Sequence, residues 1–268
     1  MALSIRQAAP GEGVHWVREA FRLFFKRPLP FATMFVAFLL VALLATLVPV
    51  VGAVAMLMAL PLLSLGFMLA SRAARSGQPV HPGLFVEPLR GDPERRKSLI
   101  KLCAVYAVGT VLIMTLSDWI DDGSFERLQR LMAKGDDNQA EMEALLADPR
   151  LVWGLVTRFG LAALLSIPFW HAPALVHWQG QGVAQALFSS TLAVWRCKGA
   201  FVMYSLAWVG VIAAFGALVG LLFGLFGARQ LAGLIAMPAG LMFSTVFYVS
   251  LLYTYEGCFS APGETGTD

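Results

Sequence analysis

Between Pro28 and Ser71 the chain contains no aspartate, glutamate, lysine or arginine. As one helix, these 44 residues would rise about 66 Å, roughly twice the hydrocarbon thickness of a bilayer, so the run must turn back on itself. Pro49 and Gly52 mark the turn, because proline lacks a backbone donor and glycine permits backbone conformations that other residues avoid. The run therefore predicts a transmembrane hairpin.

The composition of the whole chain is that of a membrane protein. Hydrophobic residues make up 58% of it and charged residues 14%, whereas soluble domains carry about 25% charged residues. The net charge of +3 gives no reason to expect a nucleic-acid partner. Cys103, Cys197 and Cys258 are far apart and form no CxxC pair, so we expect neither a disulfide framework nor a zinc site, and no cofactor.

Further apolar stretches bring the number of predicted transmembrane helices to six. We expect an all-α fold, a single integral membrane domain covering residues 1–268, with three hairpins at 31–71, 102–176 and 199–255. The individual spans are predicted at 31–48, 53–71, 102–117, 156–176, 199–227 and 231–255, with a turn at Arg229.

Two amphipathic segments, 14–27 and 183–198, precede the first and the last hairpin. Their spacing predicts interfacial helices, with an aromatic face in the acyl boundary and a basic face toward the headgroups. A third short surface helix is expected at Leu84–Arg90. The acidic insertion 118–150 has two apolar stripes around Gly135–Asn138, which predicts an extracytoplasmic helical hairpin whose role the sequence does not define.

The distribution of charge orients the chain. With the N-terminus inside, fourteen of the twenty lysines and arginines fall in cytoplasmic segments. The positive-inside rule therefore predicts that both termini lie in the cytoplasm.

The amphipathic segments also indicate an internal repeat. An offset of 170 residues aligns residues 20–26 with residues 190–196, and Phe31 with Phe201. A third copy around Leu84–Lys101 would give three hairpins in parallel orientation, each preceded by a surface helix. The alternative is a chance similarity between two aromatic helices that end in basic residues.

Several segments carry a resemblance to a known family: Trp16–Phe24, the turn Val48–Gly52, Leu60–Met68 and Ala172–Val176. They are similar to an uncharacterised family of six-span inner-membrane proteins of Gram-negative bacteria. More distantly, Ala172–Val176 with the surface helix beyond it is similar to the membrane domains of some bacterial glycerophosphodiester phosphodiesterases. The resemblance covers most of the chain except 118–150. It implies a bacterial inner-membrane address and six spans, and it implies no activity.

Arg158 is a charged residue within the fourth predicted span, and such residues are candidates for functional sites. Asp118 is expected at the same membrane level, so the two side chains are candidates for an intramembrane ion pair. Alternatively, a span that begins at Phe159 is long enough to cross, and Arg158 snorkels to the outer interface.

Small and helix-breaking residues also recur within the spans. Gly216, Gly220 and Gly224 share one helix face, which predicts close packing against another helix of this chain, with a dimer interface as the alternative. Four prolines lie inside predicted spans: Pro61, Pro168, Pro173 and Pro238. They indicate tolerated kinks or, alternatively, broken helices around a transported substrate.

Basic residues of the cytoplasmic segments form the candidate binding surface, which we call the basic collar. It consists of Arg18, Arg22, Lys26, Arg27, Arg95, Arg96, Lys97, Arg196 and Lys198. Each such charge near a membrane surface attracts anionic headgroups by about 1 kcal/mol. The alternative is that the collar only fixes the topology.

The sequence contains no HExxH, GxxxxGK[ST] or GxSxG motif and no paired carboxylates inside the spans, and the four histidines are expected at interfaces. We therefore expect a non-enzymatic scaffold or accessory factor in membrane or envelope organisation, with lipids and other membrane proteins as partners. A transporter or lipid-handling permease is the alternative. An enzyme of lipid metabolism would have to be built around Arg158 and Asp118.

Overall fold

The computed structural model describes residues 4–134, 139–225 and 232–260, which are mostly helical, and the strands among them form one short pair. The helices are α1 (Glu12–Lys26), α2 (Pro28–Ala45), α3 (Val51–Arg75), α4 (Pro93–Asp121), α5 (Ser124–Lys134), α6 (Gln139–Leu146), α7 (Pro149–Phe169), α8 (Ala172–Gln179), α9 (Val183–Arg196), α10 (Lys198–Leu225) and α11 (Ala232–Cys258). Two 3₁₀ helices, η1 (Pro82–Phe85) and η2 (Glu87–Leu89), precede α4, and β1 (Ser4–Ile5) pairs antiparallel with β2 (Phe259–Ser260).

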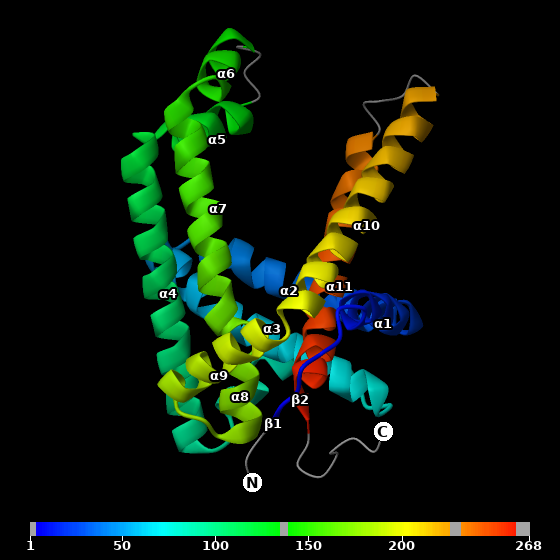
Figure 1. Cartoon of the computed structure of the whole chain (residues 1–268). Helices are drawn as coiled ribbons and strands as arrows, with labels where there is room; N and C mark the ends of the chain where they lie inside the picture. Colours follow the sequence, from blue (N-terminus) through cyan, green and yellow to red (C-terminus); the bar gives the residue numbers. More distant parts are fainter. Residues whose placement is uncertain (1–3, 135–138, 226–231, 261–268) are drawn as a thin grey trace.

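Six of the described helical segments are long and apolar enough to cross a membrane. They form three hairpins, which we number in chain order: α2–α3, α4–α7 and α10–α11 (Figure 1). The predicted all-α class with six spans in three hairpins is therefore confirmed. The predicted turns at Gly135–Asn138 and at Arg229 lie outside the described residues.

The turn of hairpin 1 lies between α2 and α3 at residues 46–50. Val50 adopts a left-handed φ of 63° there. A Cβ atom on Gly52 would lie 1.8 Å from the carbonyl oxygen of Ala45. Only glycine therefore lets the two helices meet this closely.

Two spans differ from their predicted bounds. α4 starts at Pro93 rather than at residue 102, because the Asp92 side chain accepts a hydrogen bond from the Glu94 backbone N–H at 2.9 Å and Pro93 fits the first helical turn. The fourth apolar segment runs from Pro149 to Gln179, so it starts before the predicted residue 156, and it is broken after Phe169, so that Pro173 lies in the first turn of the separate helix α8.

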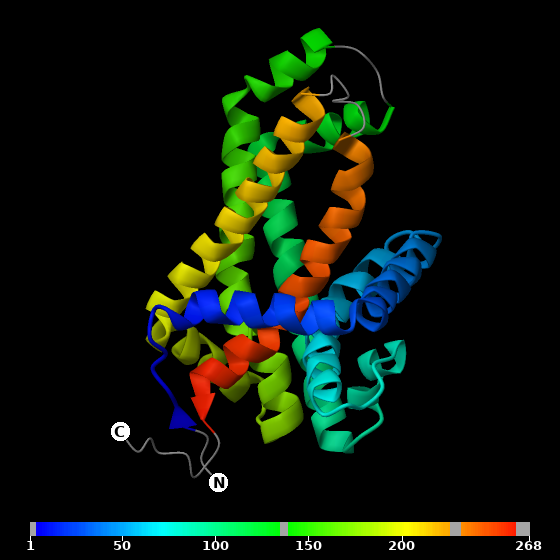
Figure 2. The same ribbon diagram turned by 90° about the vertical axis from the view of Figure 1, so that its right-hand side faces the viewer.

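Each of three surface segments packs against a hairpin: η1 and α9 against the hairpin that comes before them, and α1 against the last hairpin of the chain. η1 packs on α2 and α3, α9 packs on α7, and α1 packs on α10 and α11. Figure 2 shows α1 lying across α11. Because α1 opens the chain and hairpin 3 ends it, this last contact links the two ends of the sequence, and the pairing of β1 with β2 strengthens the link. The three hairpins are thus joined in a ring by their surface segments.

Most of the aromatic face of α1 is buried against protein and only Phe25 is largely exposed, so the expectation that this face enters the acyl boundary is wrong for Trp16 and Phe24. Trp16 is buried, and its ring centroid lies 5.7 Å from that of Phe201 and 6.3 Å from that of Tyr204. Gly13 makes this approach possible, because a Cβ there would lie 2.0 Å from the carbonyl oxygen of Ala200. Lipid and a neighbouring apolar helix both match an apolar face, so the pattern alone did not distinguish them.

Hairpins 2 and 3 diverge from each other (Figure 1). We call the end that carries α1, α8 and α9 the basic side, and the end that carries α5 and α6 the insertion side. Within the described residues, α10 is buried only at Ala200, Tyr204 and Trp208, which all lie in its half nearest the basic side. Further along α10, Phe215 contacts Phe243 on α11 with ring centroids 5.1 Å apart, and most of the remaining side chains are exposed.

Replacing Gly13 by alanine tests the packing of α1 on hairpin 3. The added methyl group would overlap the backbone of α10, and such overpacking costs about 1–3 kcal/mol. We expect a lower melting temperature in detergent micelles. Gly11→Ala is the matched control, because nothing lies within 4 Å of the Cβ position at Gly11. Equal melting temperatures for the two variants would contradict the packing described here.

Candidate functional site

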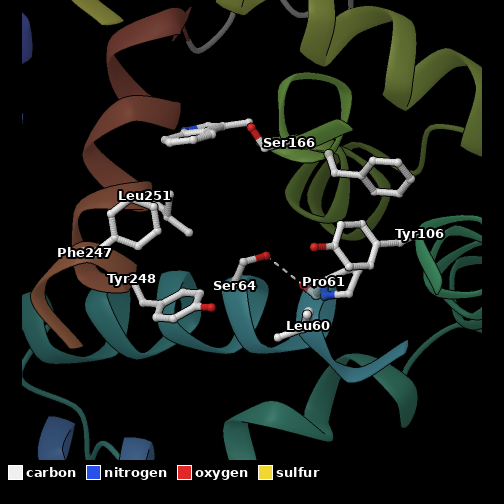
Figure 3. A pocket seen from close by; sticks show the side chains of 10 residues that line it. Leu60, Pro61, Ser64, Tyr106, Ser166, Phe247, Tyr248 and Leu251 are labelled. Atoms are coloured by element: carbon white, nitrogen blue, oxygen red, sulfur yellow. Dashed lines mark hydrogen bonds between the residues drawn. The ribbon is translucent and has the colours of Figure 1, made fainter. Parts of the chain in front are cut away.

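A cavity of about 150 Å³ lies where α3, α4, α7 and α11 converge (Figure 3). All three hairpins contribute to its walls. The lining residues are Leu60, Pro61, Ser64, Tyr106, Ser166, Phe169, Trp170, Phe247, Tyr248 and Leu251.

The walls of the cavity are aromatic, with a few hydroxyl groups and no charge. Ser64 and Ser166 each donate a hydrogen bond to a carbonyl oxygen one turn back in their own helix, at 2.8 and 2.7 Å. Figure 3 shows the hydroxyl groups of Tyr106 and Tyr248 pointing toward the middle of the cavity. Apolar walls with a few polar groups suit an apolar ligand that is oriented by weak hydrogen bonds.

Buried hydrogen bonds close the cavity toward the basic side. The indole N–H of Trp170 donates to Oγ1 of Thr254 at 3.1 Å, and Nε2 of His171 lies 3.2 Å from the same oxygen. The backbone N–H of His171 donates to Oγ of Ser190 at 3.0 Å. These bonds join the turn between α7 and α8 to both α9 and α11, so they hold hairpins 2 and 3 together.

The expectation that all four histidines lie at interfaces is wrong for His171, which is fully buried. Pro168 and Pro173 explain its position, because they flank the turn that separates α7 from α8. The turn directs the imidazole into the protein, where its ring centroid lies 5.3 Å from that of Phe259 and 5.9 Å from that of Tyr255.

A second polar cluster lies near the insertion side. Arg158 on α7 forms an ion pair with Asp118 on α4 at 2.5 Å, and it lies 3.5 Å from Asp121. Its guanidinium carbon is 3.9 Å from the ring centroid of Phe125 on α5. Only 13% of the Arg158 side chain is exposed, so it points into the protein and not toward the interface. The structure thus brings the two predicted residues together.

Asp121 is a member of this cluster that the sequence did not single out. Its side chain is fully buried, although it is the end residue of α4. Gly154 makes room for it, because a Cβ on Gly154 would lie 2.4 Å from the Cβ of Asp121. The signal in the sequence is faint, since it consists of one glycine four residues before Arg158 on the same helix face.

The predicted packing role of Gly216, Gly220 and Gly224 is not found within the chain. All three are exposed, and among the described residues no atom lies within 4 Å of the position that a Cβ would take. The reason is the divergence of hairpin 3, which carries this part of α10 away from the other helices.

The basic collar is distributed over three places on the basic side. Arg18, Arg22, Lys26 and Arg27 lie on or directly after α1, Arg95, Arg96 and Lys97 lie on the first turns of α4, and Arg196 and Lys198 flank the junction of α9 and α10. Part of the collar serves packing, because Arg27 donates to the carbonyl oxygen of Gln78 at 3.1 Å and Arg95 to that of His177 at 2.9 Å. Lys26 has no ion-pair partner within the described part of the chain.

Two cysteines that are far apart in sequence lie together. Cys197, between α9 and α10, and Cys258, at the end of α11, are both buried, and their thiols are hydrogen-bonded to each other. Cys197 also donates to the carbonyl oxygen of Arg6 at 3.3 Å. The hydrogen bond from Cys258 lowers the pKa of the Cys197 thiol to about 7. The spacing of the cysteines along the chain did not predict this pair. The contact forms because hairpin 3 brings the start of α10 close to the end of α11.

Six apolar helices, surface helices that pack across them and an uncharged cavity among them define an integral membrane protein with several spans. The chain is 32% identical over 254 residues to a probable inner membrane protein of Burkholderia thailandensis, and the match covers 92% of this chain and 90% of that relative. The chain belongs to the family of this probable inner membrane protein, and it is a multi-pass protein of the bacterial inner membrane.

No family model matches the chain, and no solved structure matches it. The distant similarity to the membrane domains of glycerophosphodiester phosphodiesterases therefore has no support among known proteins.

Replacing Arg158 by glutamine tests the cluster at the insertion side. The change leaves the buried Asp121 without a cation, and breaking a buried ion pair in this way costs about 3 kcal/mol or more. We expect a clearly lower melting temperature in detergent.

Arg150→Gln is the matched control on the same helix. Arg150 pairs with Asp122 at 3.4 Å, and both side chains are exposed, so this change is expected to cost less than about 1 kcal/mol. A melting temperature of Arg158→Gln no lower than that of the control would contradict the buried ion pair.

Proposed function

We propose that this protein binds a lipid chain in the cavity between its hairpins, as a non-enzymatic accessory factor in the organisation of membrane or envelope lipids. One observation carries the proposal: an uncharged aromatic cavity, built by all three hairpins, lies where hairpins 2 and 3 begin to diverge. A lipid chain is the apolar ligand that the surrounding bilayer supplies to such a place.

The arrangement of the helices provides a route for such a chain. Apolar residues such as Leu164 on α7 and Val209 on α10 are exposed, so lipid surrounds both hairpins. A chain that enters between the hairpins from the insertion side meets the cavity. The bonds of Trp170 and His171 to Thr254 form its floor and stop the chain from passing further.

A transporter or lipid-handling permease is the second candidate. The break between α7 and α8 beside the cavity favours it, because discontinuous helices line the substrate sites of many transporters. Since no lining residue is charged, the cargo of such a permease would be uncharged or lipid-like. We propose no catalytic role for Arg158 and Asp118, because they form an ion pair and Arg158 lies about 12 Å along α7 from Ser166 in the cavity wall.

We further propose that the basic side faces the cytoplasm. It carries the whole basic collar and the paired strands β1 and β2, whereas the acidic insertion lies at the opposite ends of the helices. The positive-inside rule then places both termini in the cytoplasm. Exposed residues of the collar are proposed to contact anionic headgroups there, other membrane proteins are further candidate partners, and nucleic acid is not.

Photo-crosslinking tests the lipid site. The full chain is reconstituted with a phospholipid that carries a diazirine near the end of one acyl chain, irradiated and digested, and the labelled peptides are identified by mass spectrometry. We expect labels on the segments that hold Tyr106 and Tyr248. Ser166→Phe fills the cavity, so it should reduce this labelling about fivefold or more.

Ser205→Phe is the matched control. Ser205 lies on an exposed face of α10, and it donates to its own helix at 3.0 Å just as Ser166 does. This variant should leave the labelling around the cavity unchanged. Labelling that is spread evenly over the exposed helices, or that is insensitive to Ser166→Phe, would contradict the proposed function.

A further inference from the structure

A cleft of about 520 Å³ lies on the basic side between α1, α3 and α11. Five of its lining residues come from α1, one from the end of α3 and two from the last turns of α11. They are His15, Glu19, Arg22, Leu23, Lys26, Arg75, Tyr253 and Glu256. The cleft and the cavity between the hairpins share no lining residue, so they are separate sites.

The cleft contains permanent charges of both signs. Arg22 pairs with Glu19 at 2.5 Å, and Arg75 pairs with Glu256. Lys26 faces the same cleft and has no acidic partner within the described residues. Three cations therefore meet two carboxylates, and the excess positive charge lies at Lys26.

The floor of the cleft is apolar. Leu23 is buried, and the ring of Tyr253 lies under the guanidinium group of Arg75 at 5.7 Å. α1 lies across α11 on the basic side (Figure 2), and an amphipathic helix in this position is expected at the level where headgroups meet acyl chains. Charged walls over an apolar floor fit the end of a lipid better than they fit a free ion.

We propose that this cleft binds the phosphoethanolamine headgroup of a membrane phospholipid. The phosphate lies against Lys26 and Arg22, and the primary ammonium group lies near Glu19 and Glu256. The phosphate then gives Lys26 the opposite charge that it lacks within the described residues, and the ammonium group adds charge-assisted hydrogen bonds to the two carboxylates.

The mixture of charges argues against the other common headgroups. A purely anionic headgroup can place the same phosphate against Lys26 and Arg22, but it has no cation to set against Glu19 and Glu256. A choline headgroup has the right charges, but its quaternary nitrogen has no N–H group to donate to a carboxylate. A primary ammonium group satisfies both conditions.

This inference shares with the proposed function the premise that the protein binds lipid, but it uses another site. Native mass spectrometry of the intact full-length protein tests it, with dioleoyl phosphatidylethanolamine, phosphatidylglycerol and phosphatidylcholine added in turn. We expect the ethanolamine lipid to bind about fivefold more tightly than either of the others.

Glu256→Gln is the informative variant. Its neutral side chain no longer attracts the ammonium group, so the preference for ethanolamine over choline should fall, with Glu19 as the one carboxylate that remains in the cleft. Binding of phosphatidylcholine should not weaken, because the cations remain, and this second readout shows that the cleft is still formed. Glu94→Gln is the matched control, since Glu94 belongs to an exposed pair with Lys97 outside the cleft.

Three results would overturn the inference. They are tighter binding of phosphatidylglycerol than of phosphatidylethanolamine, a preference for ethanolamine over choline that is unchanged in Glu256→Gln, and displacement of the lipid by an equal concentration of soluble phosphoethanolamine. The last would assign the cleft to a soluble ligand. Ser166→Phe should leave the headgroup preference unchanged, so failure of the cavity proposal and failure of this one are distinguishable.

Discussion

A bilayer offers apolar helices as favourable an environment as their neighbours do, so helices in it associate through close contacts and buried hydrogen bonds. In this protein such contacts are concentrated on the basic side. Gly13 lets α1 approach the backbone of α10, and the bonds of Trp170 and His171 to Thr254 join hairpin 2 to hairpin 3. The rest of the architecture depends on this one-sided attachment.

Hairpins 2 and 3 diverge because the polar contacts between helices are unevenly distributed along them. The two helices of hairpin 2 are also joined near the insertion side, where Arg158 on α7 pairs with Asp118 and Asp121 on α4. α10 carries no comparable group in its outer half, and no other described helix lies within 4 Å of the Cβ positions at Gly216 and Gly220. Lipid therefore surrounds the outer half of α10, and the cavity lies where the separation begins.

Features that depend on one segment were predictable from the sequence. The charge-free run with Pro49 and Gly52 defined hairpin 1, and amphipathic spacing located α1 and α9. Contacts between distant segments were not predictable. An apolar face such as that around Trp16 has the same sequence pattern whether lipid or protein covers it. The burial of His171 and the meeting of Cys197 with Cys258 depend likewise on how the chain turns back. Asp118 and Arg158 were linked in advance only because both lie near the same ends of adjacent helices.

Distances between spin labels in lipid nanodiscs test the central claim most directly, namely that hairpins 2 and 3 are joined on the basic side and separated by lipid on the other. One pair of labels at exposed positions Leu164 and Val202 reports on the basic side, and a second pair at Val152 and Leu221 reports on the insertion side. Our account predicts a clearly longer distance for the second pair. A distance for the second pair equal to or shorter than that for the first would contradict it.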